Sequence, residues 1–198
     1  MNTRNTGAAG QASHLLQISG ASVLSINDVV NNRYGESSDK IYTDVDQPAD
    51  EVRSIITQNS GKRVVDNYLL NLPSTGPARA ALVFPPIIYG QGRGVIKQRS
   101  VQIPELARVA IESRTAVQVG KGEACWSHVF IEDISNIFVR LVERAVQGEG
   151  GANDSGLWNR EGMIFAGDGR MVFPFAPLDG RARQDVLTTV RTSPKSPI

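Results

Sequence analysis

Cysteine and histidine, the side chains that most often form disulfides or hold metals, are nearly absent from this sequence. The chain has one cysteine, Cys125, and two histidines, His14 and His128. A single cysteine excludes a disulfide framework and a cysteine-based metal site, and so few histidines argue against a histidine-rich one. We therefore expect no bound metal, and the sparing use of cysteine favours a reducing, cytoplasmic location.

Long apolar runs and an excess of charge are also missing. The net charge is +1 over 198 residues. No apolar run approaches the roughly 20 residues that cross a bilayer. A near-neutral chain has no basic field to attract phosphates, so we expect neither a nucleic-acid nor a membrane partner. Residues 1–13 are small and polar and lack the apolar core of a signal peptide, which predicts a disordered lead.

The remaining sequence alternates between strand-like and helix-like segments. The short apolar run at 15–19 predicts a buried strand, and the continuous apolar run at 78–84 is typical of a strand covered on both faces. Apolar residues recur at helical spacing in 62–72, 105–114 and 133–147. This order predicts an α/β fold with a partial doubly wound, Rossmann-like parallel sheet.

Weaker patterns complete the predicted unit, which spans residues 14–170. Residues 25–54 are polar and carry no strong period, so we expect a long excursion with one short helix. Residues 116–119 predict a short strand, and 157–170 predict one more strand or a hairpin. Residues 171–198 are polar and contain proline and serine, which predicts an irregular or disordered tail.

Two loops are expected at the carboxyl edge of the sheet, where ligands bind in open α/β folds. "SGASVL" follows the first strand, and "PPIIYGQGRG" follows the second, where Pro85 and Pro86 end the hydrogen-bonded ladder. The glycine-rich part of the second loop does not open a helix, so we do not expect it to bind phosphates. The sequence thus predicts a ligand site between these two loops.

Three segments in this order, "QISGASVL", "FPPIIYGQGRG" and "WSHVFIEDISNIFVRLVERA", resemble the second half of the extended short-chain dehydrogenases/reductases of the NAD-dependent epimerase/dehydratase family. The match in order and spacing covers residues 14–165. The resemblance implies a nucleotide-binding sheet, a small C-terminal substrate lobe and bound NAD or NADP. It also implies an oxidoreductase or epimerase that acts on a small molecule.

The resemblance further implies where the site residues lie. Beside the nicotinamide it places Gly20, Lys62, Pro85, Pro86 and Ile87. The family's catalytic serine or threonine falls at Ala21, so the flanking Ser19 and Ser22 are the candidate hydroxyls, with Lys62 as the catalytic lysine. Substrate contacts are implied for Tyr89, Gly90, Gly92, Trp126 and His128.

Three departures from the family pattern bear on activity. Only the polar lead precedes residue 14, so the family's first strand and glycine-rich phosphate turn have no counterpart. Gln58 stands four residues before Lys62, where the family has a tyrosine that transfers a proton, and an amide cannot exchange that proton. The third departure is Ala21. We therefore expect a truncated or decayed copy, with a non-catalytic remnant or regulatory module as the alternative to an active enzyme.

Structural roles stay open for several of these residues. Lys62 also fits a solvated helix residue, His128 a hydrogen-bonded structural histidine and Trp126 packing within the lobe. The turn glycines are equally compatible with an ordinary turn. A homodimer is a further alternative, because the helices predicted at 62–72 and 105–114 would expose apolar stripes unless a second copy covered them.

Overall fold

A parallel three-stranded sheet forms the centre of the molecule. The computed structural model describes residues 12–44, 48–115, 118–147, 155–167 and 169–172. The sheet has the order β1 (Ser13–Ile18), β2 (Ala78–Phe84) and β5 (Met163–Phe165). β1 pairs with β2 along its full length, from Ser13 opposite Ala78 to Ile18 opposite Val83. The predicted α/β fold with a parallel sheet is confirmed.

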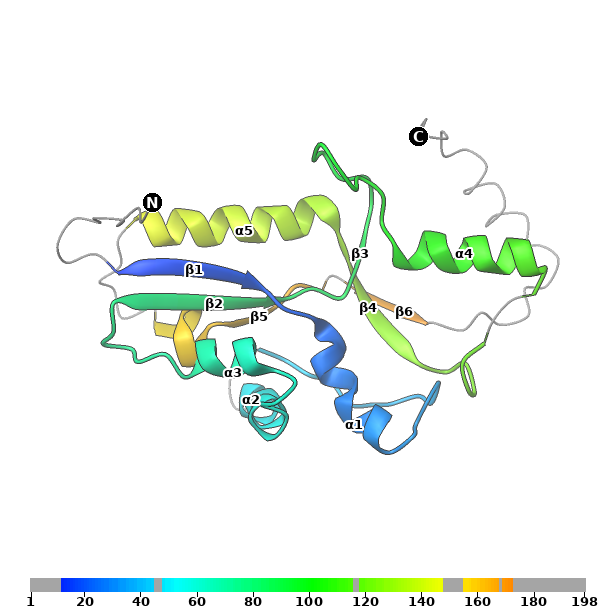
Figure 1. Cartoon of the computed structure of the whole chain (residues 1–198), viewed down its shortest axis with the longest axis horizontal. Coiled ribbons are helices and arrows are strands. Elements are labelled where there is room, and N and C mark those ends of the chain that lie inside the picture. Colours follow the sequence, from blue (N-terminus) through cyan, green and yellow to red (C-terminus); the bar gives the residue numbers. More distant parts are fainter. Residues whose placement is uncertain (1–11, 45–47, 116–117, 148–154, 168, 173–198) are drawn as a thin grey trace.

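A second, smaller sheet continues from the end of the first. After Pro85 and Pro86 the chain forms β3 (Ile87–Tyr89), which pairs in parallel with β4 (Cys125–Phe130). β6 (Gly169–Val172) pairs antiparallel with β4. β5 and β6 thus lie in different sheets and form no hairpin. Figure 1 shows β3 and β4 leaving the region where β1 and β2 end, so the two sheets meet at the carboxyl edge of the first.

Helices cover both faces of the central sheet (Figure 1). On one face lies α5 (Ile131–Val146), whose Ile134 and Leu141 pack with Ala81 and Val83 of β2. On the other lie α2 (Pro48–Gln58), α3 (Val64–Leu70) and the 3-10 helix η1 (Ala21–Ser25). Their buried residues pack against alternate side chains of β2. The helices contribute Val23, Val52, Ile56 and Leu69, and β2 contributes Leu82 and Phe84. Alternation along β2 explains why one strand feeds two cores.

Most predicted helices are confirmed with shifted ends. The helix expected at 62–72 is the shorter α3, and the one expected at 105–114 is α4 (Gln102–Ser113). The long excursion expected at 25–54 contains the short α1 (Ile26–Val30) and also the start of α2, which the sequence pattern missed. Polar residues surround the apolar stripe of α2 and obscure its period. Gln118 and Val119 of the strand expected at 116–119 are not in a strand. The lead expected at 1–13 and the tail expected at 171–198 lie mostly outside the described residues, but Ser13 begins β1, and Met171 and Val172 belong to β6.

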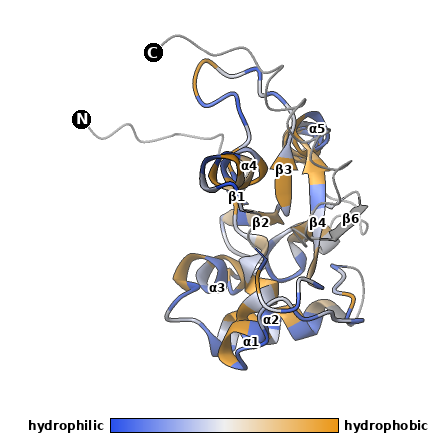
Figure 2. Ribbon diagram, turned by 90° about the vertical axis from the view of Figure 1, so that its right-hand side faces the viewer, coloured by the Kyte–Doolittle hydropathy of each residue, from blue (hydrophilic) through white to orange (hydrophobic). Residues whose placement is uncertain are grey.

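The described residues of the 90–124 segment, which are 90–115 and 118–124, are thinly packed. In α4 only Ala107 is buried, and the loop before it leaves Val95 97% exposed. In α3, Val64, Val65 and Tyr68 are each more than half exposed. Figure 2 shows apolar stretches along the ribbon of this helix. β2 is therefore well packed, whereas the segment that follows β3 is not. β1 lies at the edge of the sheet and leaves Leu15 and Ile18 about half exposed, so the expectation of a buried strand at 15–19 holds only in part.

Two loops lock together beside this thin region, in a contact that we call the loop clasp, formed by residues 34–36 and 119–123. The backbone N–H of Glu123 donates to the carbonyl of Gly35 at 2.8 Å. Lys121 Nζ lies 3.3 Å from Glu36 Oε1. A Cβ on Gly35 would lie 1.8 Å from the carbonyl oxygen of Val119, so only glycine allows the backbones this close.

Candidate functional site

The carboxyl ends of β1 and β2 lie side by side. Ile18 pairs with Val83, and the backbone N–H of Ser19 donates to the carbonyl of Val83 at 2.8 Å. The loops that begin at Ser19 and at Pro85 therefore start at the same edge of the sheet. This is the juxtaposition that the sequence predicts for a ligand site in an open α/β sheet.

Four polar side chains form one hydrogen-bonded network at this edge, which we call the Ser19 cluster: Ser19, Ser22, Arg63 and Asp66. Ser19 Oγ donates to Asp66 Oδ2 at 2.8 Å. Arg63 Nη2 donates to Ser22 Oγ at 2.8 Å. Arg63 Nη1 lies 3.4 Å from Asp66 Oδ2 and also 3.4 Å from the carbonyl oxygen of Gly20. The cluster joins the loop after β1 to the start of α3.

Asp66 reaches the cluster from the first turn of α3. Arg63 is the N-cap of this helix and makes no side-chain capping bond. An acidic residue in the first helical turn commonly accepts a hydrogen bond from a free backbone N–H. The hydrogen bonds of the Asp66 carboxylate instead join it to Ser19 and Arg63. Its position is thus determined by a contact with a residue 47 positions away in the sequence.

The cluster combines a buried charge with two accessible hydroxyls. The Asp66 side chain is 8% exposed and that of Arg63 16% exposed. A buried carboxylate is costly unless it is paired and hydrogen-bonded, and Arg63 and Ser19 provide these two interactions. Ser19 is half-buried and Ser22 is exposed, so both hydroxyls lie at the rim of the cluster, where a ligand can contact them.

Lys62, which the sequence pattern selected, lies next to the cluster but outside it. α2 ends at Gln58 and α3 begins at Val64, so Lys62 occupies the turn between the two helices. Its side chain is exposed and forms no hydrogen bond or ion pair within the described part of the chain. The neighbouring Arg63 makes the contacts with Ser22 and Asp66. Sequence reasoning missed this pair because an arginine and an aspartate three residues apart at a helix start resemble a surface ion pair.

Tyr42 is the tyrosine that the structure places beside a lysine. Lys40 Nζ lies 5.1 Å from the centre of the Tyr42 ring and also pairs with Glu51. Burial raises the pKa of Tyr42 above its ordinary value, and Lys40 opposes this only in part. A tyrosine that transfers protons near neutral pH needs a lowered pKa. Tyr42 is therefore a poor replacement for the tyrosine that the family resemblance would place at position 58.

The residues expected at the substrate end come together on the second sheet. The Tyr89 ring lies 5.4 Å from the ring of His128 and 5.5 Å from that of Phe130, measured between centroids. Trp126 precedes His128 by two residues on β4, so strand alternation puts both on this face. Gly90 has a φ of +99°, and a Cβ there would lie 2.4 Å from the Phe130 ring. The fifth expected residue, Gly92, lies farther along the loop.

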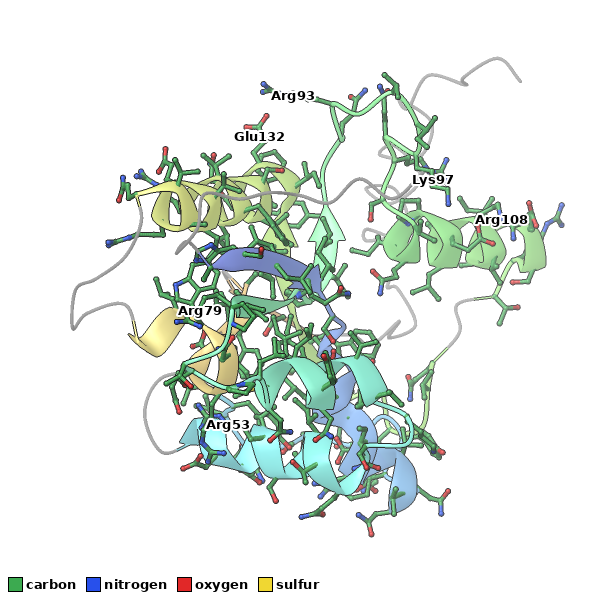
Figure 3. The ribbon with its side chains drawn as sticks, turned by 60° about the vertical axis from the view of Figure 1, so that its left-hand side comes forward. Arg53, Arg79, Arg93, Lys97, Arg108 and Glu132 are labelled. Atoms are coloured by element: carbon green, nitrogen blue, oxygen red, sulfur yellow. The ribbon has the colours of Figure 1, made fainter. Side chains whose placement is uncertain are left out.

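The glycine-rich loop after β3 folds back on itself and does not open a helix, as predicted. The backbone N–H of Gly92 donates to the carbonyl of Gln98 at 2.7 Å, and Gln91 bridges to Arg99. Figure 3 shows Arg93 from this loop beside Glu132 at the start of α5, and the two form an ion pair. The loop is thus tied to α5.

Four of the residues expected beside the nicotinamide lie where the loops after β1 and β2 begin. Gly20 and Pro86 are half-buried at the carboxyl edge, whereas Pro85 and Ile87 are buried behind them. A Cβ at Gly20 would meet Ser22 Oγ at 3.4 Å, an ordinary contact, so this glycine is not a tight phosphate cradle. No glycine turn between a strand and a helix of the phosphate-binding kind occurs among the described residues.

Two open hollows of the surface are lined by residues outside the Ser19 cluster. One of about 840 Å³ runs along α5 and is lined by residues such as Val129, Ile137 and Gly167. Another of about 730 Å³ lies beside α3, next to Gly61 and Tyr68. Within the described ranges, no acidic, histidine or cysteine side chains gather as metal ligands, and no helix has the length and apolarity to span a membrane.

Comparison with known proteins gives one informative similarity. The chain is 31% identical over 156 residues to "Oxidase ucsJ" from Acremonium sp, a match that covers 77% of this chain and 44% of that protein. The chain thus spans less than half of the length of this relative. No family model matches the chain, and no solved structure matches it significantly. The similarity connects this sequence to a protein named as an oxidase.

Proposed function

We propose that this chain carries the nicotinamide and substrate side of an NAD(P)-dependent oxidoreductase of the extended short-chain dehydrogenase/reductase type. The observation that carries the proposal is the carboxyl edge, where the loops after β1 and β2 meet and the Ser19 cluster presents two hydroxyls. Similarity to a protein named as an oxidase supports an oxidoreductase. A bound NAD or NADP would supply the redox chemistry.

The proposed roles follow from position. Ser22 accepts a hydrogen bond from Arg63, so its own O–H can donate to a carbonyl or alcohol oxygen of the substrate. The Ser19 hydroxyl donates to Asp66 and can accept a hydrogen bond from a substrate alcohol. Gly20 and Pro86 line the place of the nicotinamide, with the buried Pro85 and Ile87 supporting them from behind. Lys62 is exposed one residue before the cluster, where it would contact the cofactor only from its outer side. The aromatic group made by Tyr89, Trp126 and His128 would receive the substrate.

A non-catalytic module of the same fold is the second candidate. It is favoured by the lack of a phosphate turn among the described residues and by Gln58 in place of tyrosine. The exposed Val64, Val65 and Tyr68 of α3 would then form the contact with a second copy. Sedimentation of the chain and of Val65→Glu tests this reading, since a dimer through α3 should become monomeric in the variant.

Nucleotide titration tests the proposed function. NADPH and NADH are added separately to the purified chain, and nucleotide fluorescence and melting temperature are followed together. Gly20→Val places an isopropyl group at the edge where the nicotinamide would lie, and the φ of −130° at Gly20 accepts a side chain. Gly61→Val is the matched control, because no atom lies within 4 Å of a Cβ there.

The expected result is saturable binding that raises the melting temperature. Gly20→Val should weaken this binding about 10-fold or more, as blocking a well-fitted contact does, while Gly61→Val should leave it unchanged. Equal binding by both variants would place the nucleotide elsewhere. No binding by the wild-type chain would contradict the proposal and favour the non-catalytic module.

A further inference from the structure

Asp66 is a buried acid that neither the sequence pattern nor the similarity explains. It is the third residue of α3, yet its carboxylate is directed at the Ser19 hydroxyl and not at the backbone of its own helix turn. Asp133 occupies the same third position in α5 and is exposed. The difference between these two aspartates shows that burial of Asp66 is not a general feature of helix starts in this chain.

Within the cluster, only the hydroxyl of Ser19 connects the buried Asp66 carboxylate to the exposed rim. The Ser19 hydroxyl donates its hydrogen bond to Asp66 Oδ2 at 2.8 Å, so the lone pairs of Ser19 Oγ can accept a hydrogen bond from a ligand hydroxyl. Ser19 is half-buried, whereas Asp66 is buried. A substrate oxygen can thus reach Ser19, and can reach Asp66 only through it.

We propose that Ser19 and Asp66 form a proton relay for a substrate alcohol, in place of the tyrosine that is absent at Gln58; the assignment rests on the proposed function. The alcohol O–H bond breaks as its proton binds Ser19 Oγ. In the same step the original Ser19 O–H bond breaks, and that proton binds Asp66 Oδ2. The negative charge of Asp66 thereby moves to the substrate oxygen as an alkoxide. No electrons are gained or lost in this step, and carbonyl reduction uses the same two transfers in reverse.

Arg63 is a positioning residue for this relay. Its guanidinium binds the Ser22 hydroxyl and the Gly20 carbonyl and also lies 3.4 Å from Asp66, so one side chain fixes both the loop and the carboxylate. The guanidinium makes these contacts from two nitrogens at once, which the single ammonium of lysine cannot reproduce. Arg63→Lys should therefore loosen the geometry while retaining the charge.

The relay is tested with four variants of the full chain and one probe alcohol. The variants are Ser19→Ala, Asp66→Asn, Arg63→Lys and the matched control Asp133→Asn. The probe is para-fluorobenzyl alcohol, whose binding is followed by fluorine NMR without nucleotide and whose oxidation is followed as formation of NADPH from NADP. Nucleotide binding and melting temperature are measured for every protein.

The two relay residues should give different signatures. Ser19→Ala should weaken probe binding about 10-fold, because it removes the contacting hydroxyl. Asp66→Asn retains an oxygen that accepts the Ser19 hydrogen bond but takes up no proton, so probe and nucleotide binding should persist while kcat falls about 100-fold with little change in KM. Arg63→Lys should lower kcat less than Asp66→Asn, and Asp133→Asn should match the wild type.

The remaining outcomes each contradict either the relay or the proposed function. Turnover by Asp66→Asn within about threefold of Asp133→Asn would overturn the relay, since general acid–base catalysis contributes far more than that. Loss of probe binding in Asp66→Asn would make Asp66 a structural residue and would also overturn it. A wild-type chain that binds no nucleotide would contradict the proposed function, and the Ser19→Ala effect on the probe signal would then separately decide whether Ser19 receives an alcohol. A wild-type chain that binds nucleotide but never oxidises the probe would contradict the relay.

Discussion

The central sheet and the segment from residue 90 to residue 124 are built in opposite ways. Every residue of β2 from Ala80 to Phe84 is buried, because helices cover both faces of the strand. In the 90–124 segment, α4 buries only Ala107, and Val95 and Ile96 are 97% and 77% exposed. Figure 1 shows α4 standing apart from the layers around β1 and β2.

The contrast indicates two levels of stability in one chain. Hydrophobic burial stabilises the central sheet, while the 90–124 segment is held at its ends by polar contacts, the Arg93–Glu132 ion pair and the loop clasp. Segments with few buried contacts open at lower free energy than the core they are attached to. The Ser19 cluster lies on the stable side of this boundary, and the aromatic group around Tyr89 lies where the thin segment begins.

The largest effect is expected from a pair of identical substitutions, Val83→Ala in β2 and Val95→Ala in the loop. Val83 is fully buried and Val95 is 97% exposed. Val83→Ala should lower the free energy of unfolding by about 2–3 kcal/mol, from lost burial and the cavity left behind. Val95→Ala should change it by less than about 0.5 kcal/mol. Urea unfolding measures both, and similar losses for the two variants would remove the distinction between the regions.

A smaller and local effect is expected when the loop clasp is broken by Gly35→Ala. The φ of +71° and the Val119 carbonyl both oppose a Cβ at this position. The loops can separate without unfolding the core, so the loss should stay near 1–2 kcal/mol. Hydrogen exchange should rise at the Glu123 amide, which donates to Gly35, and remain unchanged at Leu82. Gly61→Ala is the control, and a rise spread over β2 would show that the clasp also supports the core.

The same contrast explains how much could be predicted from the sequence. β2 is a continuous apolar run because both of its faces are buried, and α5 is a long amphipathic pattern with one buried stripe, so the fold class followed from these two elements. The strand pattern also predicted that the loops after β1 and β2 begin at the same edge of the sheet, and with this the position of Ser19. The role of Asp66 and the loop clasp could not be predicted, because each depends on a contact between residues far apart in the sequence. Ser19 and Asp66, for example, are 47 residues apart. Local pattern carries no information on such contacts.

The smallest effect is expected within α4, from Glu105→Gln. Hydrogen bonding to Arg108 lowers the pKa of Glu105 below its ordinary value of 4.5. The folded pKa is depressed, so this contact stabilises α4 above that value and is lost as the pH falls through the folded pKa. The side chains are exposed, so salt should screen the effect. Unfolding is compared between wild type and variant from about pH 7 to about pH 3, at low and high salt.

The wild type should lose a small increment of stability on the acid side that Glu105→Gln does not lose, and the two proteins should converge at low pH. Arg108→Met supplies the control: without the guanidinium, adding Glu105→Gln should have no further pH-dependent effect, as a double-mutant cycle requires. Because α4 contributes so little burial, the increment should appear in hydrogen exchange of α4 before it appears in global unfolding. An acid-side loss of the same size in exchange of β2 amides would mean that α4 and the central sheet unfold together, and that the two regions form one cooperative unit.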